Sequence, residues 1–154
     1  MAKTKKQSAG ILLYRAGVPL PEVFLVHPGG PFWKNKDAGA WTIPKGEFDD
    51  SEDPLAAAIR EFKEETGYNI KGEFKPLGHI QQKAGKAVYA WAMAGDIDAT
   101  TIKSNFFEME WPPKSGKKQS FPEIDRASWF KLSEAREKIN SSQAQFLDQL
   151  LTLI

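Results

Sequence analysis

The sequence contains no cysteine, and this absence removes several classes of function at once. Disulfide scaffolds, cysteine zinc sites and thiol nucleophiles all need side chains that the chain does not have. The sequence also lacks an apolar stretch near the ~20 residues that a membrane-spanning helix requires. Its basic N-terminus leads into an apolar run, residues 9–14, that is too short for a secretory signal. These absences predict a soluble cytoplasmic protein with no membrane partner.

The chain has almost no net charge, because 21 lysines and arginines face 20 aspartates and glutamates. A protein that binds duplex nucleic acid by charge alone needs a basic excess, so duplex nucleic acid is not the expected partner. A small polyanion needs only a local site, and the charge balance does not exclude it. The 154 residues, 41% of them hydrophobic, are enough for one domain over residues 1–154. The oligomeric state is not indicated.

Segments with strand character alternate with helical patterns along the chain. Strands are expected at residues 8–15, 22–27, 41–43, 73–81, 86–94, 106–111 and 127–132. Helices are expected at residues 133–139 and 142–151, besides one that begins at Pro54. Loops are expected at residues 27–40, which are rich in glycine and proline, and at residues 111–123, which are basic. The alternation has no strict βαβ rhythm, so it predicts an α/β (α+β) fold with a central mixed sheet and helices on both faces.

The best-marked helix lies within the stretch GEFDDSEDPLAAAIREFKEETGY, residues 46–68. Asp53 is a good N-cap, Pro54 suits the first helical position, and Gly67 suits the C-terminal stop. The apolar residues that fall at core-facing spacing are Leu55, Ala58, Ile59 and Phe62.

An adjoining face of the same helix carries Glu61, Glu64 and Glu65 at i, i+3 and i+4. Such a face can simply be solvated, because each like-charge pair costs only about 0.2–0.5 kcal/mol. The alternative is a metal site, since three carboxylates on one patch form an all-oxygen donor set. Mg²⁺ and Mn²⁺ prefer that set.

The spacing around these glutamates is that of a known motif. The stretch reads as Gly46, five residues, Glu52, seven residues, and then REFKEETGY from Arg60. It resembles the complete box of the Nudix hydrolase family, G-x5-E-x7-R-E-U-x-E-E-x-G-U, where U is bulky and apolar or aromatic. A chance match to the seven fixed letters is expected about once in a million chains of this composition. The resemblance implies a Nudix-like α/β/α sandwich.

The resemblance also implies a role for each box residue. Glu64 and Glu65 resemble the main metal ligands, Glu61 a third ligand, and Gly46 the glycine whose carbonyl joins the metal shell. Arg60 resembles the family's orienting arginine, paired with a box glutamate, which we expect to be Glu52. The alternatives are a surface salt bridge for Arg60 and a helix-dipole carboxylate for Glu52.

A further acid, Glu123, lies six residues before Trp129 in FPEIDRASWF. Family members carry a metal-binding or base glutamate in a loop ahead of a similar tryptophan strand, and by that resemblance Glu123 is the candidate general base or additional ligand. The alternative is a loop acid that pairs with Arg126, and Asp125 is a weaker candidate for the same role.

Substrate contacts are expected in the loops, which carry specificity on a rigid scaffold. Lys45 precedes the box and is a candidate phosphate contact, unless it is an exposed turn lysine. Trp33, beside Phe32, is a candidate to stack on a base, although aromatic side chains are more often in the core.

Three lysines of the basic loop, Lys114, Lys117 and Lys118, are candidates to hold extra phosphates. A solvated loop explains them equally well.

The resemblance implies a metal-dependent pyrophosphohydrolase that uses Mg²⁺ or Mn²⁺ to activate water against a phosphoanhydride bond. WTIPKG and the closing helical region further resemble the diadenosine tetraphosphate pyrophosphohydrolase branch. The expected substrate is a dinucleoside polyphosphate or a nucleoside triphosphate. A nucleoside diphosphate sugar and an RNA 5′ end are the alternatives. A nucleotide-binding sensor module is the alternative that is not an enzyme.

Overall fold

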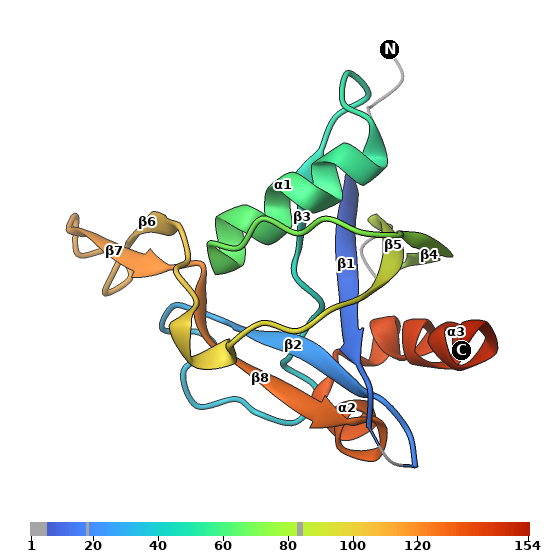
Figure 1. Cartoon of the computed structure of the whole chain (residues 1–154). Coiled ribbons are helices and arrows are strands. Elements are labelled where there is room, and N and C mark those ends of the chain that lie inside the picture. The colour runs from blue at the N-terminus through green and yellow to red at the C-terminus, as the bar shows by residue number, and fades with distance from the viewer. Residues whose placement is uncertain (1–5, 18, 83–84) are drawn as a thin grey trace.

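The computed structural model of the chain describes residues 6–17, 19–82 and 85–154, so residues 1–5 of the basic N-terminus lie outside it. Figure 1 shows a central sheet with α1 on one face and α2 and α3 on the other, the mixed fold that the sequence predicts. The strands are β1 (Gln7–Arg15), β2 (Glu22–Pro28), β3 (Lys45–Phe48), β4 (Lys75–Gln81), β5 (Ala87–Ala94), β6 (Phe106–Glu110), β7 (Lys118–Pro122) and β8 (Ile124–Lys131). The helices are α1 (Pro54–Thr66), η1 (Ala99–Thr101), α2 (Leu132–Lys138), η2 (Ser141–Gln143) and α3 (Ala144–Leu153).

Strand β1 organises the six-stranded sheet, whose path is β4-β5-β1-β2-β8 with β3 paired to β1 outside that path. One edge of β1 pairs in parallel with β5 from Gln7 to Tyr14. The other edge is shared, because β3 takes Gln7 to Gly10 and β2 takes only Tyr14 and Arg15. The β2–β8 arm and the β3 segment therefore diverge from the same strand, and a gap opens between them that other groups must line.

The two faces of the sheet carry separate cores. Helix α1 buries Ala57, Ala58 and Phe62 completely against one face. Helix α3 buries Phe146, Leu147 and Leu150 against the other, and α2 joins it there. Burying one such large side chain contributes about 1.5–3 kcal/mol. The core therefore fixes α1 rigidly against β1, and the polar face of α1 is held in place with it.

Two expectations about strands are wrong. Residues 41–43 form only isolated bridges, Val26 to Thr42 and Trp41 to Ile139, and the neighbouring strand is β3, which begins at Lys45. The segment expected as a basic loop contains β7, which pairs with β6 in a hairpin. Alternation is weak in KQSFP, and pairing with a partner strand decides its conformation.

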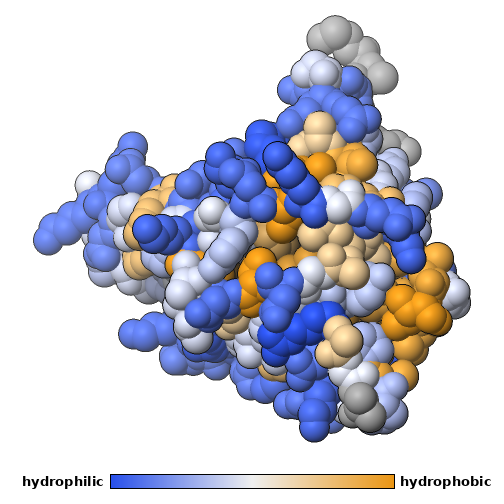
Figure 2. Space-filling view, viewed as in Figure 1, coloured by the Kyte–Doolittle hydropathy of each residue, from blue (hydrophilic) through white to orange (hydrophobic). Residues whose placement is uncertain are grey.

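The other expected elements are confirmed, with ends shifted by a few residues. The hairpin of β6 and β7 projects from the side of the sheet in Figure 1. Its surface in Figure 2 is mostly hydrophilic with hydrophobic patches, and a larger hydrophobic area gathers around the end of α3. No helix in the described residues is long and apolar enough to cross a membrane.

Candidate active site

Helix α1 presents the box carboxylates from a well-capped frame. The side chain of Asp53 accepts a hydrogen bond of 3.0 Å from the backbone N of Ala56, and Pro54 occupies the first turn. Gly67 ends the helix in the left-handed conformation, with φ of 83°, and its N–H donates to the carbonyl of Lys63. Only glycine adopts this φ at little cost. The predicted caps are confirmed, and they fix the spacing of the glutamates between them.

Glu61 lies against the backbone of β3 at Gly46. A Cβ atom at Gly46 would stand 2.0 Å from Cδ and Oε2 of Glu61, so no larger residue fits there with Glu61 in place. The glycine is needed for close approach rather than for an unusual φ. Burial raises the pKa of Glu61, and the hydrogen bond from Arg60 acts in the opposite direction.

Arg60 links the acids of this region through separate nitrogens. Nε and Nη2 donate to the two oxygens of Glu52 at 2.8 and 2.9 Å, which is the ion pair that the box predicts. Nη1 donates to Glu61 at 2.8 Å and to Glu64 at 3.2 Å. The bond with Glu52 is the main cause of a raised pKa for Arg60, and it lowers the pKa of Glu52. One guanidinium therefore offsets much of the repulsion on the helix face.

Glu65 and Lys45 face each other at the start of β3. The backbone N of Lys45 donates to Oε1 of Glu65 at 3.1 Å. Burial raises the pKa of Glu65 well above its ordinary value, and burial likewise lowers the pKa of Lys45. The alternative of an exposed turn lysine is wrong, because Lys45 is half-buried on a strand. A nearby positive charge would stabilise the ionised form of Glu65, and a nearby negative charge would stabilise the ionised form of Lys45.

Glu123 lies close to these acids, at the single position between the end of β7 and the start of β8. Its backbone is held at both ends, since its N donates to the carbonyl of Asn105 and its carbonyl accepts from Gly29, each at 2.8 Å. Burial, and then the charge of Glu64, raises the pKa of Glu123. Arg126 stacks over the ring of Trp41 at 5.5 Å, so the arginine that the alternative assigns to Glu123 is engaged elsewhere.

A cavity of about 290 Å³ lies in the gap between the diverging arms of the sheet. Four predicted residues line it together: Trp33, Lys45, Glu65 and Glu123. Trp33 has 38% of its surface exposed and Phe32 has 60%, so the alternative that places these aromatics in the core is wrong. The structure thus brings one aromatic ring, one lysine and two carboxylates to a single concave site, which is the usual form of a ligand pocket.

The sequence did not single out the amide side chains of this cavity, Gln82, Asn140 and Gln143. Gln143 is fully buried, and its Oε1 accepts from the backbone N of Ile43 at 3.0 Å. Its Nε2 has no hydrogen-bond partner within residues 6–17, 19–82 and 85–154, which is unusual for a buried amide. Gln82 lies far from Asn140 and Gln143 in the sequence, so the three amides form no recognisable motif. The amphipathic pattern of α3 predicts a helix after Gln143, but it does not indicate a role for the amides that precede it.

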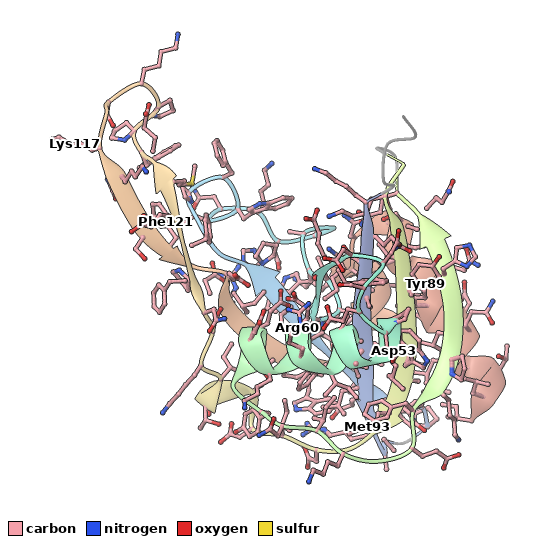
Figure 3. The ribbon with its side chains drawn as sticks, turned by 90° about the horizontal axis from the view of Figure 1, so that it is seen from above. Asp53, Arg60, Tyr89, Met93, Lys117 and Phe121 are labelled. Carbon is pink, nitrogen blue, oxygen red and sulfur yellow. The ribbon has the colours of Figure 1, made fainter. Side chains whose placement is uncertain are left out.

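The basic loop lies away from the cavity. Figure 3, viewed from above, shows Lys117 at the far tip of the β6–β7 hairpin and Arg60 over the middle of α1. Lys114, Lys117 and Lys118 are all exposed, and none of them lines the cavity. The structure therefore does not bring these three lysines together with the box.

The box carboxylates fit a divalent cation by their chemistry. All donors are oxygens, two of the acids are buried enough for a raised pKa, and Gly46 leaves open the space that Glu61 fills. Within residues 6–17, 19–82 and 85–154, however, no three acidic, histidine or cysteine side chains already converge as a metal cage. Nη1 of Arg60 stands between Glu61 and Glu64. The donor set is present, and the carboxylates have to turn toward a cation to hold it.

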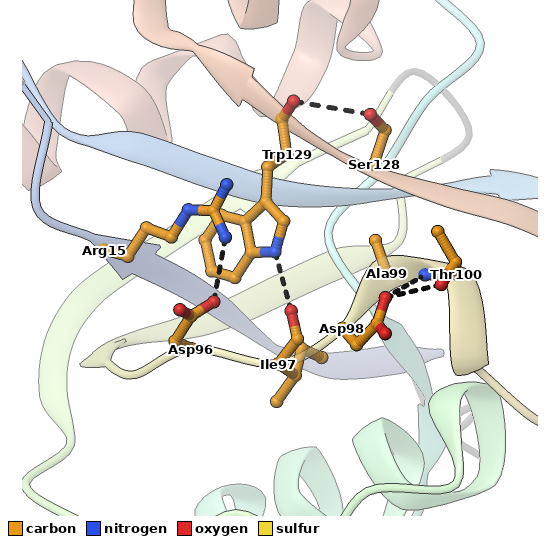
Figure 4. A pocket seen from close by; sticks show the side chains of 8 residues that line it. All are labelled: Arg15, Asp96, Ile97, Asp98, Ala99, Thr100, Ser128 and Trp129. Carbon is orange, nitrogen blue, oxygen red and sulfur yellow. Dashed lines mark hydrogen bonds and ion pairs between the residues drawn. The ribbon is translucent and has the colours of Figure 1, made fainter.

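A wider depression of about 600 Å³ contains none of the predicted site residues. Figure 4 shows the guanidinium of Arg15 over the ring of Trp129, 4.2 Å from its centroid. Arg15 is also bonded to Asp96 at 2.9 Å, and Trp129 Nε1 donates to the carbonyl of Ile97. These groups are satisfied by one another, so the smaller cavity at α1 is the better candidate for chemistry.

Comparison with known proteins agrees with the motif. A model of the NUDIX domain matches residues 4–150. An Ap4A hydrolase of C. elegans in a binary complex is 23% identical, with a TM-score of 0.65 over 95% of this chain and 96% of that one. The NUDIX domain of NrtR from Shewanella oneidensis, complexed with ADP ribose, is 14% identical, with a TM-score of 0.67 over 99% of this chain and 90% of that one.

The MutT protein of Methanosarcina mazei Go1 is 18% identical, with a TM-score of 0.63 over 99% of this chain and 97% of that one. No curated protein matches the sequence. At these identities the solved structures establish a shared fold, whereas the domain match spans nearly the whole chain. The chain therefore belongs to the Nudix family of pyrophosphohydrolases.

Proposed function

We propose that this Nudix hydrolase cleaves a phosphoanhydride bond in a dinucleoside polyphosphate or a nucleoside triphosphate. The observation that carries the proposal is the composition of the cavity at α1. Its lining includes the ring of Trp33 and the amides of Asn140 and Gln143, which suit a base. It also includes Lys45, Glu65 and Glu123, which suit phosphates and their counterions.

Mg²⁺ or Mn²⁺ would be held by Glu61, Glu64 and Glu65, with the carbonyl of Gly46 as a further donor. When bound, such an ion supplies positive charge to the phosphates and acidifies a coordinated water. Arg60 binds Glu52 and the other glutamates through different nitrogens, so Glu61 and Glu64 could turn from Nη1 toward a cation while the pair with Glu52 stays intact. We assign Arg60 and Glu52 the role of fixing the frame of the site.

Glu123 is our candidate to accept the proton of the attacking water, or to serve as an additional ligand. Its backbone is fixed at both ends, it borders the cavity, and burial favours its protonated form. A carboxyl whose pKa lies closer to neutrality is a better base at neutral pH. Asp125 is a poorer candidate, because its carboxylate is already bonded to His27 at 2.8 Å.

A nucleoside diphosphate sugar is the second candidate substrate, because the structurally similar NrtR domain was solved with ADP ribose. An RNA 5′ end would extend beyond a cavity of about 290 Å³. A sensor module that binds a nucleotide without hydrolysing it would need the pocket, but it would not need the complete set of box carboxylates. All four glutamates and Arg60 are present here, which favours the enzyme.

The test is a substrate panel with Mg²⁺ whose products are separated by chromatography. The panel compares diadenosine tetraphosphate, the common nucleoside triphosphates and several nucleoside diphosphate sugars. Glu64→Gln is the blank and is expected to fold normally and lose most turnover. Glu73→Gln, an exposed acid outside the box, is the matched control. Turnover by Glu64→Gln at the wild-type rate would refute the metal-ligand assignment, and binding without turnover of any substrate would favour the sensor module.

A further inference from the structure

The pairing of β2 with β8 contains one extra residue beside the cavity. His27 is opposite Arg126, but the next pair is Pro28 with Ile124, so Asp125 has no partner on β2. This is a β-bulge, which bends a strand and turns a side chain to a new direction. Here the bulge turns the carboxylate of Asp125 onto a buried histidine of the facing strand.

That histidine, His27, is fully buried and uses both ring nitrogens. Nδ1 meets Oδ1 of Asp125 at 2.8 Å, and Nε2 meets the backbone carbonyl of Lys36 at 2.6 Å. A carbonyl only accepts, so Nε2 carries a proton and donates it. The ring also packs edge-on against Trp41, with 5.2 Å between centroids. His27 is thus locked on two sides and bonded to a loop nine residues further along the chain.

The loop that His27 holds is residues 29–40, which carries Trp33 to the cavity. The ends of the loop have their own anchors: Gly29 donates to the carbonyl of Glu123, and Asp37 accepts from Nε1 of Trp41 at 2.8 Å. Between those anchors, the partners of the Trp33 backbone among the described residues both lie within the loop, at Gly30 and at Lys36. Phe32 packs edge-on against Trp111 of the hairpin, with 5.5 Å between centroids. Among the bonds from the six-stranded sheet, the one from His27 to Lys36 is the nearest to Trp33 along the chain.

We propose that His27 and Asp125 form a positioning pair that fixes Trp33 at the cavity and so sets the affinity for the base of the substrate. The pair joins β8, which follows Glu123, to the loop of residues 29–40 that carries Trp33. Neither residue lines the cavity, so their effect passes through the loop. The role in affinity rests on the proposed function, whereas the role in holding the loop does not.

The first test measures the loop alone, by limited trypsin digestion of the intact protein. His27→Phe keeps a ring against Trp41 and loses both hydrogen bonds, so cleavage after Lys34 should become about tenfold faster. Cleavage after Lys71, which is exposed in the loop between α1 and β4, is the internal reference and should not change. Cleavage after Lys34 at the wild-type rate, relative to that reference, would overturn the proposal.

Two further variants separate a lost tether from a misfolded protein. In Asp125→Asn the new amide can donate to Nδ1 while Nε2 still donates to Lys36, so the loop should stay as protected as in the wild type. If His27→Phe fails to fold, His27→Leu, which also loses both bonds, should again make cleavage after Lys34 about tenfold faster. An unchanged rate in His27→Leu would then overturn the proposal.

The second test is kinetic. In His27→Phe, KM for a nucleoside triphosphate should rise about tenfold with little change in kcat, since a bond of this kind is worth about that factor. KM for inorganic tripolyphosphate, which has no base to stack, should not change. An equal rise for both would refute a role through Trp33. If the wild type hydrolyses neither, the proposed function fails, and the digestion still decides whether the pair holds the loop.

Discussion

Gly46→Ala is the substitution that best tests the geometry of the candidate active site. The added Cβ would stand 2.0 Å from Cδ and Oε2 of Glu61 and 2.5 Å from Oε1. Non-bonded carbon atoms normally rest about 3.5–4.0 Å apart. The strand is held by its pairing with β1, so the carboxylate of Glu61 has to move. Its 2.8 Å bond to Arg60 is broken in the same step.

The expected cost follows from these contacts. Overpacking a well-packed site costs about 1–3 kcal/mol. Replacing glycine where its φ is ordinary returns about 0.4–1 kcal/mol through the unfolded state. The net loss should be about 1–2 kcal/mol in the free energy of unfolding, measured in urea. Gly72→Ala is the matched control, because the nearest atom to its Cβ is the flexible Sδ of Met93 at 3.3 Å. The affinity for Mn²⁺, measured by calorimetry, should fall in Gly46→Ala alone.

A double-mutant cycle isolates the cause. In a Glu61→Ala background the clashing atoms are gone, so adding Gly46→Ala should cost nothing further or stabilise slightly. Two results would refute the reasoning. One is a Gly46→Ala protein as stable as Gly72→Ala. The other is a cost that persists undiminished without the side chain of Glu61, which would mean that the cost does not come from a clash with Glu61.

Three further predictions concern the metal, the loop anchor and the hairpin. Mg²⁺ at a hundred times its Kd should raise the free energy of unfolding by about 2.7 kcal/mol, seen as a higher Tm that Glu64→Gln does not share. The pKa of Asp37 is lowered from 3.8, chiefly by its bond to Lys138, so its stabilising effect is complete above pH 3.8 and is lost as the pH falls through the folded-state pKa. The stability difference between wild type and Asp37→Asn should therefore shrink in acid, and a constant difference would contradict this. Lys117→Ala with Lys118→Ala should raise KM only for substrates long enough to reach the hairpin, so unchanged kinetics with triphosphorylated RNA would leave these lysines as solvated surface.

The local features of the site could be predicted from the sequence because they depend on residues close together in the chain. Asp53 and Gly67 act on the backbone within one turn of α1, so the cap preferences alone give the bounds of the helix. The helical repeat then fixes which glutamates share a face. The resemblance to the Nudix box implied the ion pair of Arg60 with Glu52, and it is present.

The cavity could not be predicted, because it depends on which strands pair. The sharing of one edge of β1 between β3 and β2 leaves no local mark, yet it opens the gap that Gln82 and Asn140 line. Strand β7 was missed for the same reason, since its partner β6 supplies what its own residues lack. The bulge at Asp125 is likewise a mismatch between two strands, visible only when their registers are compared.

Arg60 connects groups that come from different elements of the fold. A lysine would bring the same charge, but a single ammonium cannot reach Glu52 with two parallel bonds and still meet Glu61 and Glu64. The guanidinium does so because its nitrogens point in different directions from one plane. Glu52 comes from the turn before the helix, and Glu61 is pressed against β3 by the tight fit at Gly46. The arginine therefore ties the turn, the helix and, through Glu61, the sheet into one frame, and the carboxylates can face a cation without the frame having to be rebuilt.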